Sequence, residues 1–141
     1  MMASKLQIVL PEVGRAMRSL AHNSLREENG PSLQQFRILE LTHKGLSQTQ
    51  MAHFLQVSMA AVSKLVDSLV KHGFLERIQC EDRRCLQLKL TPEGKRIYKK
   101  VTSQIEKSID KHVVKLTKEE VSDLEKGLAV LDKIMGMINE K

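Results

Sequence analysis

The chain has 141 residues and a mass of 16.0 kDa, with 41% hydrophobic and 28% charged residues, which indicates a soluble globular protein with a core and excludes a disordered chain. Aromatic residues make up 3%, there are two cysteines, and no apolar run is long. These features argue against base stacking on single strands, a disulfide framework, a signal peptide and a membrane span, so we expect a cytoplasmic protein. The net charge of +6 is compatible with an anionic partner.

The first predicted helix covers residues 5–28. Pro11 either begins its regular part or bends it, since proline has no N–H to donate. Asn29-Gly30-Pro31 marks its end. Apolar residues recur in it at steps of four and three, the spacing of a seam that packs against another helix: Leu6, Leu10, Val13, Met17 and Leu20.

Three further helix starts follow, each marked by a serine. Ser32 and Ser47 are each followed three residues later by glutamine, the signature of a capping box. They predict a helix ending near Gly45 and a short second helix. Ser58 predicts a third helix that runs to about Gly73. Its predicted buried stripe is Met59, Val62, Leu65, Val66, Leu69 and Val70, and its predicted outward face is Ala60, Ser63, Lys64, Asp67 and Lys71.

The period then changes to two, which predicts a β-hairpin over residues 74–80 and 86–90. Its charged tip is Glu81-Asp82-Arg83-Arg84. Thr91-Pro92 predicts a helix start, and that helix runs to about Leu116. A capping box of Thr117 and Glu120 begins the last helix, whose apolar seam is Val121, Leu124, Leu128, Leu131, Met135 and Ile138.

A short helix, a tight turn at Gln56-Val57 and a second amphipathic helix form a helix-turn-helix pattern. The second helix begins with small residues that would let it enter a major groove, and Lys64 follows one turn after Ala60. Arginines at the hairpin tip would suit a minor groove. The predicted base-reading residues are Ser58, Ala60, Ala61, Ser63 and Lys64, and the predicted phosphate contacts are Gln34, Gln48 and Thr49.

The basic charge is concentrated in the same region. Residues 58–100 hold ten lysines and arginines against five acidic residues, a balance of +5. Together these features favour binding of double-stranded DNA. Two alternatives remain: a winged helix that binds an acidic protein, and a structural helical dimerisation module. The second leaves the basic hairpin tip unexplained.

The segments Leu65–Arg77, Glu81–Arg84 and Leu88–Gly94 resemble the MarR family of winged-helix transcription regulators. The resemblance covers essentially the whole chain. It implies a mainly α fold with a small β-hairpin, in which a winged helix-turn-helix is joined to long N- and C-terminal dimerisation helices. It further implies a homodimer on a pseudo-palindromic operator, most often as a repressor. By the same match, Asp82 braces the wing, Arg83 or Arg84 enters the minor groove, and Asp67 pairs with Arg77.

The predicted domains are an N-terminal dimerisation helix over residues 1–30, a DNA-binding domain over 31–92 and C-terminal dimerisation helices over 93–141. The predicted dimerisation residues belong to the two seams: Leu6, Val13, Met17, Leu20, Val121, Leu124, Leu128, Leu131, Met135 and Ile138. We interpret the seams as intersubunit, because three long helices outside a compact winged helix leave too much apolar stripe for one subunit to cover. Packing of these helices within one chain is the alternative.

Many members of this family respond to a small aromatic or anionic effector. The resemblance would place its cleft near Met17, Leu20, Phe36, Leu39 and the start of the helix after Thr91, where an ordinary packed core is the alternative. Neither a catalytic pattern nor a cofactor motif stands out, and the five histidines lack metal-ligand spacing, so we expect no enzyme, cofactor or metal site. Thiol-based sensing also occurs in the family. However, if Ile78 shares a face with Leu86 and Leu88, Cys80 and Cys85 point apart, which disfavours a disulfide between them.

Overall fold

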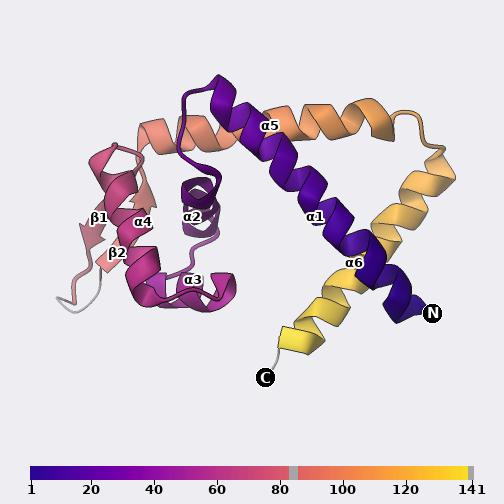
Figure 1. The fold of residues 1–141 in the computed structure, drawn as a ribbon, viewed down its shortest axis with the longest axis horizontal. Coiled ribbons are helices and arrows are strands. Elements are labelled where there is room, and N and C mark those ends of the chain that lie inside the picture. Colours follow the sequence, from indigo (N-terminus) through magenta and orange to yellow (C-terminus); the bar gives the residue numbers. More distant parts are fainter. Residues whose placement is uncertain (83–85, 140–141) are drawn as a thin grey trace. The chain divides into compact units, whose positions relative to one another are not determined.

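A computed structural model describes residues 1–82 and 86–139. Within these residues the chain forms helices and one antiparallel hairpin, which confirms the predicted mainly α class (Figure 1). Two compact units are present, residues 1–105 and residues 106–141, with the boundary inside one helix. The elements in chain order are α1 (Met2–Glu27), α2 (Leu33–His43), α3 (Gln48–Leu55), α4 (Met59–Lys71), β1 (Leu75–Gln79), β2 (Leu86–Leu90), α5 (Pro92–Val113) and α6 (Lys118–Asn139).

The predicted caps set where the helices begin. The Ser32 hydroxyl accepts the Gln35 N–H at 3.2 Å, and the Gln35 side chain accepts the Ser32 N–H at 2.9 Å. Ser47 with Gln50 repeats this capping box at α3, and Thr117 with Glu120 repeats it at α6. Each box satisfies backbone N–H groups that have no partner within the helix, so the starts follow directly from local sequence.

Helix α1 is longer than predicted and contains Pro11 in its interior. The interpretation that the regular helix begins at Pro11 is therefore wrong. Proline at this position leaves the carbonyl of Gln7 without its usual helical N–H donor, but the turns on both sides keep theirs.

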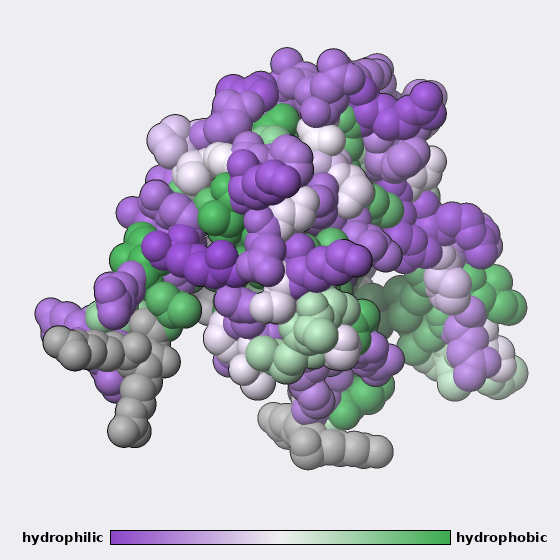
Figure 2. Space-filling view, turned by 60° about the vertical axis from the view of Figure 1, so that its left-hand side comes forward, coloured by the Kyte–Doolittle hydropathy of each residue, from purple (hydrophilic) through white to green (hydrophobic). Residues whose placement is uncertain are grey.

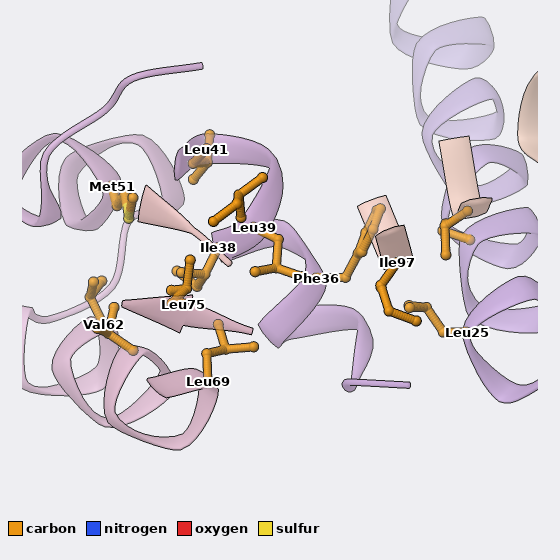
Figure 3. Close-up of a cluster of buried hydrophobic side chains, with 14 of the residues drawn as sticks. Leu25, Phe36, Ile38, Leu39, Leu41, Met51, Val62, Leu69, Leu75 and Ile97 are labelled. Atoms are coloured by element: carbon orange, nitrogen blue, oxygen red, sulfur yellow. The ribbon is translucent and has the colours of Figure 1, made fainter. Parts of the chain in front are cut away.

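The core of the first unit lies between α2, α4 and the hairpin, with α1 and α5 packed against one end. Val62, Leu69 and Leu75 meet Ile38 in its centre (Figure 3). At the other end, Leu25 of α1 and Ile97 of α5 lie beside Phe36 of α2 (Figure 3). This arrangement packs α4 and the hairpin against the same core.

Met59 differs from its predicted place in the buried stripe of α4. Its side chain is 48% exposed, whereas Val62, Val66 and Leu69 are buried. Met59 is the first residue of the helix, and the first turn extends past the edge of the core. The stripe therefore begins one turn later than periodicity alone predicts.

The register of the hairpin also differs from expectation. Leu75 pairs with Leu90, Ile78 with Gln87 and Gln79 with Leu86. Directly paired residues share a face, so Ile78 lies on the face opposite to Leu86 and Leu88. The physical reason is the burial of Leu75. Because that side chain is fixed in the core, Ile78, three residues further, must point the other way.

The apolar seam of the last helix is only partly covered within the described residues. No residue of α6 is buried, and Leu124, Leu128 and Ile138 are each at least half exposed. Val121, Leu131 and Met135 are half-buried. In α1 the seam residues Val13 and Met17 are exposed as well, while Leu6 and Leu20 are half-buried. Both seams are therefore available to a partner.

A cluster of charges joins the end of α1 to the start of α5. The Glu28 carboxylate, in a side chain only 14% exposed, contacts the Lys100 Nζ at 2.8 Å and the Arg96 guanidinium at 3.4 Å. Arg96 also pairs with Glu93 at 2.7 Å. The hydrogen bonds from Lys100 and Arg96 outweigh partial desolvation and lower the pKa of Glu28.

We expect Glu28→Gln to destabilise the protein at neutral pH and to matter less in acid. A carboxyl group whose pKa is lowered by folding stabilises the fold at pH values above its ordinary pKa, near 4.5. This contribution is lost as the pH falls further, through the lowered pKa of the folded state. Urea unfolding at pH of about 7, 5 and 3.5 tests this. The difference between wild type and variant should persist to about pH 5 and shrink at the lowest pH. The neighbouring exposed Glu27→Gln is the control, and an equal pH dependence in both variants would contradict the assignment.

Candidate nucleic-acid interface

Helices α3 and α4 form a helix-turn-helix. Gln56 ends α3 with a left-handed conformation, φ 55°, and Ser58 caps α4 by accepting the Ala61 N–H at 3.0 Å. Both features keep the turn at two or three residues. Figure 1 shows α4 beside the hairpin, with α2 and α3 on its other side.

The predicted base-reading residues line the free side of α4. Ser58, Ala60 and Lys64 are exposed, and Ala61 and Ser63 are half-buried at its flanks. The first turn carries no acidic residue. A narrow, uncharged leading end followed by a lysine can approach the edges of base pairs without a steric or electrostatic penalty.

The ion pair between Asp67 and Arg77 is present, as the family resemblance implies. Asp67 lies on the same exposed side of α4 as Lys64, while Arg77 belongs to β1. The pair therefore connects α4 to the hairpin.

A hollow of about 560 Å³ lies beside α4, between it and the start of α2. Gln35 and Ser68 both line it, and Gln35 donates from Nε2 to the Ser68 hydroxyl at 2.8 Å. Of the predicted phosphate contacts, only Gln34 lines the hollow. Thr49 is exposed and Gln48 half-buried on the first turn of α3. The lining residues are Gln34, Gln35, Arg37, Leu55, Val57, Ala61, Lys64, Leu65 and Ser68.

Arg37 is a residue of this face that sequence analysis missed. It lines the same hollow as Lys64, its guanidinium lies 6.0 Å from the centre of the Phe54 ring, and it pairs with Glu40 at 3.6 Å. Its place one turn into α2 gives no sequence signal, because only the packing of α2 beside α4 brings it to this face.

The wing is described in part. Asp82 is exposed at the tip of the hairpin, whereas Arg83, Arg84 and Cys85 lie outside the described residues. The roles assigned to Asp82, Arg83 and Arg84 therefore stay predictions.

The sequence analysis disfavoured a disulfide at Cys80, and this prediction is wrong. The structure assigns Cys80 to a disulfide. The argument against a bridge assumed that Ile78 shares a face with Leu86 and Leu88. The observed register removes that premise, since Ile78 pairs with Gln87. Cys80 also lies just beyond the end of β1, where strand alternation no longer fixes the direction of a side chain.

Phe36 and Leu39, expected near an effector cleft, are buried in the core. Among the described residues, no three histidine, cysteine or acidic side chains are grouped as metal ligands. Over the same residues, none of the helices has the length and apolar character needed to cross a membrane.

These features define a winged helix-turn-helix with long flanking helices. The sequence model described as "MarR family" matches residues 32–86, which span α2 to the start of β2. No curated protein matches the chain. Solved structures, in contrast, do match it.

A MarR family protein from Bacillus stearothermophilus has 19% identity and a TM-score of 0.83, with 96% of each chain covered. The transcriptional regulator Tm0710 from Thermotoga maritima has 26% identity and a TM-score of 0.73, with 98% of this chain and 99% of that chain covered. FabT from Streptococcus pneumoniae, solved in complex with DNA, has 20% identity and a TM-score of 0.77, with 97% and 99% covered.

The predicted resemblance is thus confirmed. Residues 32–86 match the MarR family, and the chain has the fold of a MarR-family transcription regulator along nearly its whole length.

Proposed function

We propose that this protein is a homodimeric transcription regulator that binds double-stranded DNA in a sequence-specific manner, most simply as a cytoplasmic repressor. The observation that carries the proposal is the exposed leading end of α4, where small residues precede Lys64. FabT, which shares the fold, was solved with DNA, and this supports the proposal. In this scheme residues 31–92 bind DNA, and residues 1–30 and 93–141 hold the dimer.

The exposed seams of α1 and α6 support the proposed dimer. A second copy of the chain would bury both seams and would hold two recognition helices about 34 Å apart, the spacing of successive major grooves. The operator should then be a pseudo-palindrome. Lys64 would lie in reach of a base edge or a phosphate, the wing arginines would enter the minor groove, and Gln34, Gln48 and Thr49 would contact the phosphate backbone.

We further propose that a small ligand or an oxidant releases the DNA. The oxidant is supported by the disulfide of Cys80, which lies at the base of the wing. A small aromatic or anionic ligand is supported by the hollow that Arg37 and Lys64 line beside the recognition helix.

Salt dependence of binding to a duplex from the intergenic DNA beside the gene tests the proposal. We expect log affinity to fall linearly with log salt concentration, because phosphate contacts release counterions. Lys64→Ala should reduce the magnitude of this slope by about 1, the effect of losing one phosphate contact. Arg84→Ala should weaken specific binding by about 1–3 kcal/mol. Lys126→Ala on α6 is the matched control.

Absence of duplex binding at low salt would instead favour the acidic-protein alternative. Unchanged affinity in both Arg83→Ala and Arg84→Ala would remove the wing from the scheme. The same titration with and without dithiothreitol tests release by an oxidant. An affinity for the duplex that does not change with the reductant would contradict release by oxidation.

A further inference from the structure

Three large apolar side chains are exposed around the turn between α3 and α4. Phe54, Val57 and Met59 are 55%, 43% and 48% exposed, and none belongs to the core cluster or to the half-buried residues packed against it. Hydrophilic residues cover most of the face in Figure 2, with hydrophobic side chains in separate groups. Exposed apolar side chains at a proposed binding surface call for an explanation.

Met59 stands at the leading end of the proposed recognition helix. It is the first residue after the Ser58 cap, so its side chain lies at the tip that would enter the groove first. Helix geometry places it one turn before Ser63, and the column of Ala60 and Lys64 runs next to it. Met59 is therefore continuous with the base-reading residues, and no charged side chain belongs to the same turn.

Phe54 and Val57 have other neighbours. The Arg37 guanidinium lies over the Phe54 ring, and Val57 lines the hollow beside α4. Met59 does not line the hollow beside α4, and it belongs neither to the core cluster nor to the half-buried residues packed against that cluster. Its exposed thioether side chain is the one most available to a partner at the tip of α4.

The chemistry of the partner follows from the surroundings. A lysine and a basic wing lie on the same domain, which favours a polyanion over an apolar protein surface. In the major groove of unmodified B-DNA, the C5-methyl group of thymine is the apolar group that a base pair exposes, and apolar side chains read it by contact.

We propose that Met59 reads a thymine methyl group in each half-site, so that the operator carries an A·T pair with its thymine facing the start of α4. This inference rests on the proposed DNA binding and adds to it a base preference carried by an apolar contact. The long, unbranched methionine side chain can adjust to the methyl group without a hydrogen-bond requirement.

Selection from a library of random-sequence duplexes, followed by single replacement of each selected thymine by deoxyuridine, tests the proposal. Deoxyuridine removes the methyl group and keeps every hydrogen-bonding group of the base. For wild-type protein we expect a loss of about fourfold in affinity at one position per half-site, the effect of one buried methyl-sized group. Fluorescence anisotropy at one fixed salt concentration measures it.

Variants of Met59 make the test specific. Met59→Ala should bind the thymine and deoxyuridine duplexes equally, whereas Met59→Leu, which keeps the apolar bulk, should still distinguish them. Because Met59 is exposed and outside the core, neither change should unfold the protein, and circular dichroism checks this. Ile78 is an exposed apolar residue on the outer face of the hairpin. The Ile78→Ala variant is the control and should retain the full methyl preference.

Failure of the inference can be told apart from failure of the proposed function. If the wild-type protein enriches no duplex, both the proposed DNA binding and the role of Met59 are contradicted. If it binds the selected duplex but tolerates deoxyuridine at every position, only the role of Met59 is contradicted. The same holds if Met59→Ala keeps the methyl preference.

Discussion

Gly94→Ala is expected to lower the free energy of unfolding by about 3 kcal/mol, because a side chain has no room at this position. A Cβ atom on Gly94 would lie 2.1 Å from the carbonyl oxygen of Phe74 and 3.1 Å from its carbonyl carbon. Both are backbone atoms, so no side-chain rotation relieves the overlap. The first turn of α5 would have to move away from the end of α4 and the start of the hairpin.

The surrounding hydrogen bonds make that movement costly. The Phe74 carbonyl accepts the Thr91 N–H at 3.2 Å. The Thr91 hydroxyl in turn donates to the Gly73 carbonyl at 2.5 Å and accepts the Gly94 N–H at 3.1 Å. An alanine at position 94 would disturb this whole set, which fixes α5 to the winged helix.

Urea unfolding at a fixed protein concentration measures the effect, with Gly45→Ala as the matched control. Gly45 has a φ of 87° but open space around its Cβ position, so its substitution carries backbone strain of about 1 kcal/mol without a clash. Equal losses in the two variants would show that the approach of Phe74 is not what requires glycine at position 94.

Four of the helix starts were predictable because each is decided within four residues. Ser32, Ser47, Ser58 and Thr117 all cap the helices that the sequence predicts, and the capping hydrogen bonds join residues three apart. The change of period after Gly73 likewise predicted the hairpin. These signals require no knowledge of how the elements pack.

The errors arose where packing between elements decides the outcome. The exposure of Met59 depends on where the core ends, and the face of Ile78 depends on the burial of Leu75 against other elements. The approach of Gly94 to Phe74 and the contacts of Glu28 with α5 join residues 20 and more than 65 positions apart. A single sequence does not show directly which distant residues will be in contact. A glycine in the first turn of a helix, such as Gly94, does indicate that another part of the chain can approach closely there.

Leu128→Glu is expected to convert the protein from a dimer to a monomer and to reduce operator affinity at least a hundredfold. Leu128 is 56% exposed within one chain and lies on the apolar seam of α6 with Leu124 and Leu131. In the proposed dimer a carboxylate there would be buried without a partner, which costs several kcal/mol. A monomer would present one recognition helix and would lose the gain from joining two half-sites.

Val130→Glu provides a matched control. Val130 is 58% exposed, nearly the same as Leu128, and the same charge is introduced on the same helix. However, helical geometry places position 130 well away from the seam that Leu124, Leu128 and Leu131 share. This variant should remain dimeric and bind the operator normally, as measured by analytical ultracentrifugation and anisotropy at micromolar protein.

The comparison separates the dimer from general effects of charge. A monomeric Leu128→Glu protein with normal helix content by circular dichroism and weak operator binding would tie the α6 seam to DNA recognition. A dimeric Leu128→Glu protein would place the intersubunit contact elsewhere. In that case the exposed seam of α6 would need another partner, and the spacing of the two recognition helices would have to be set by α1 and α5.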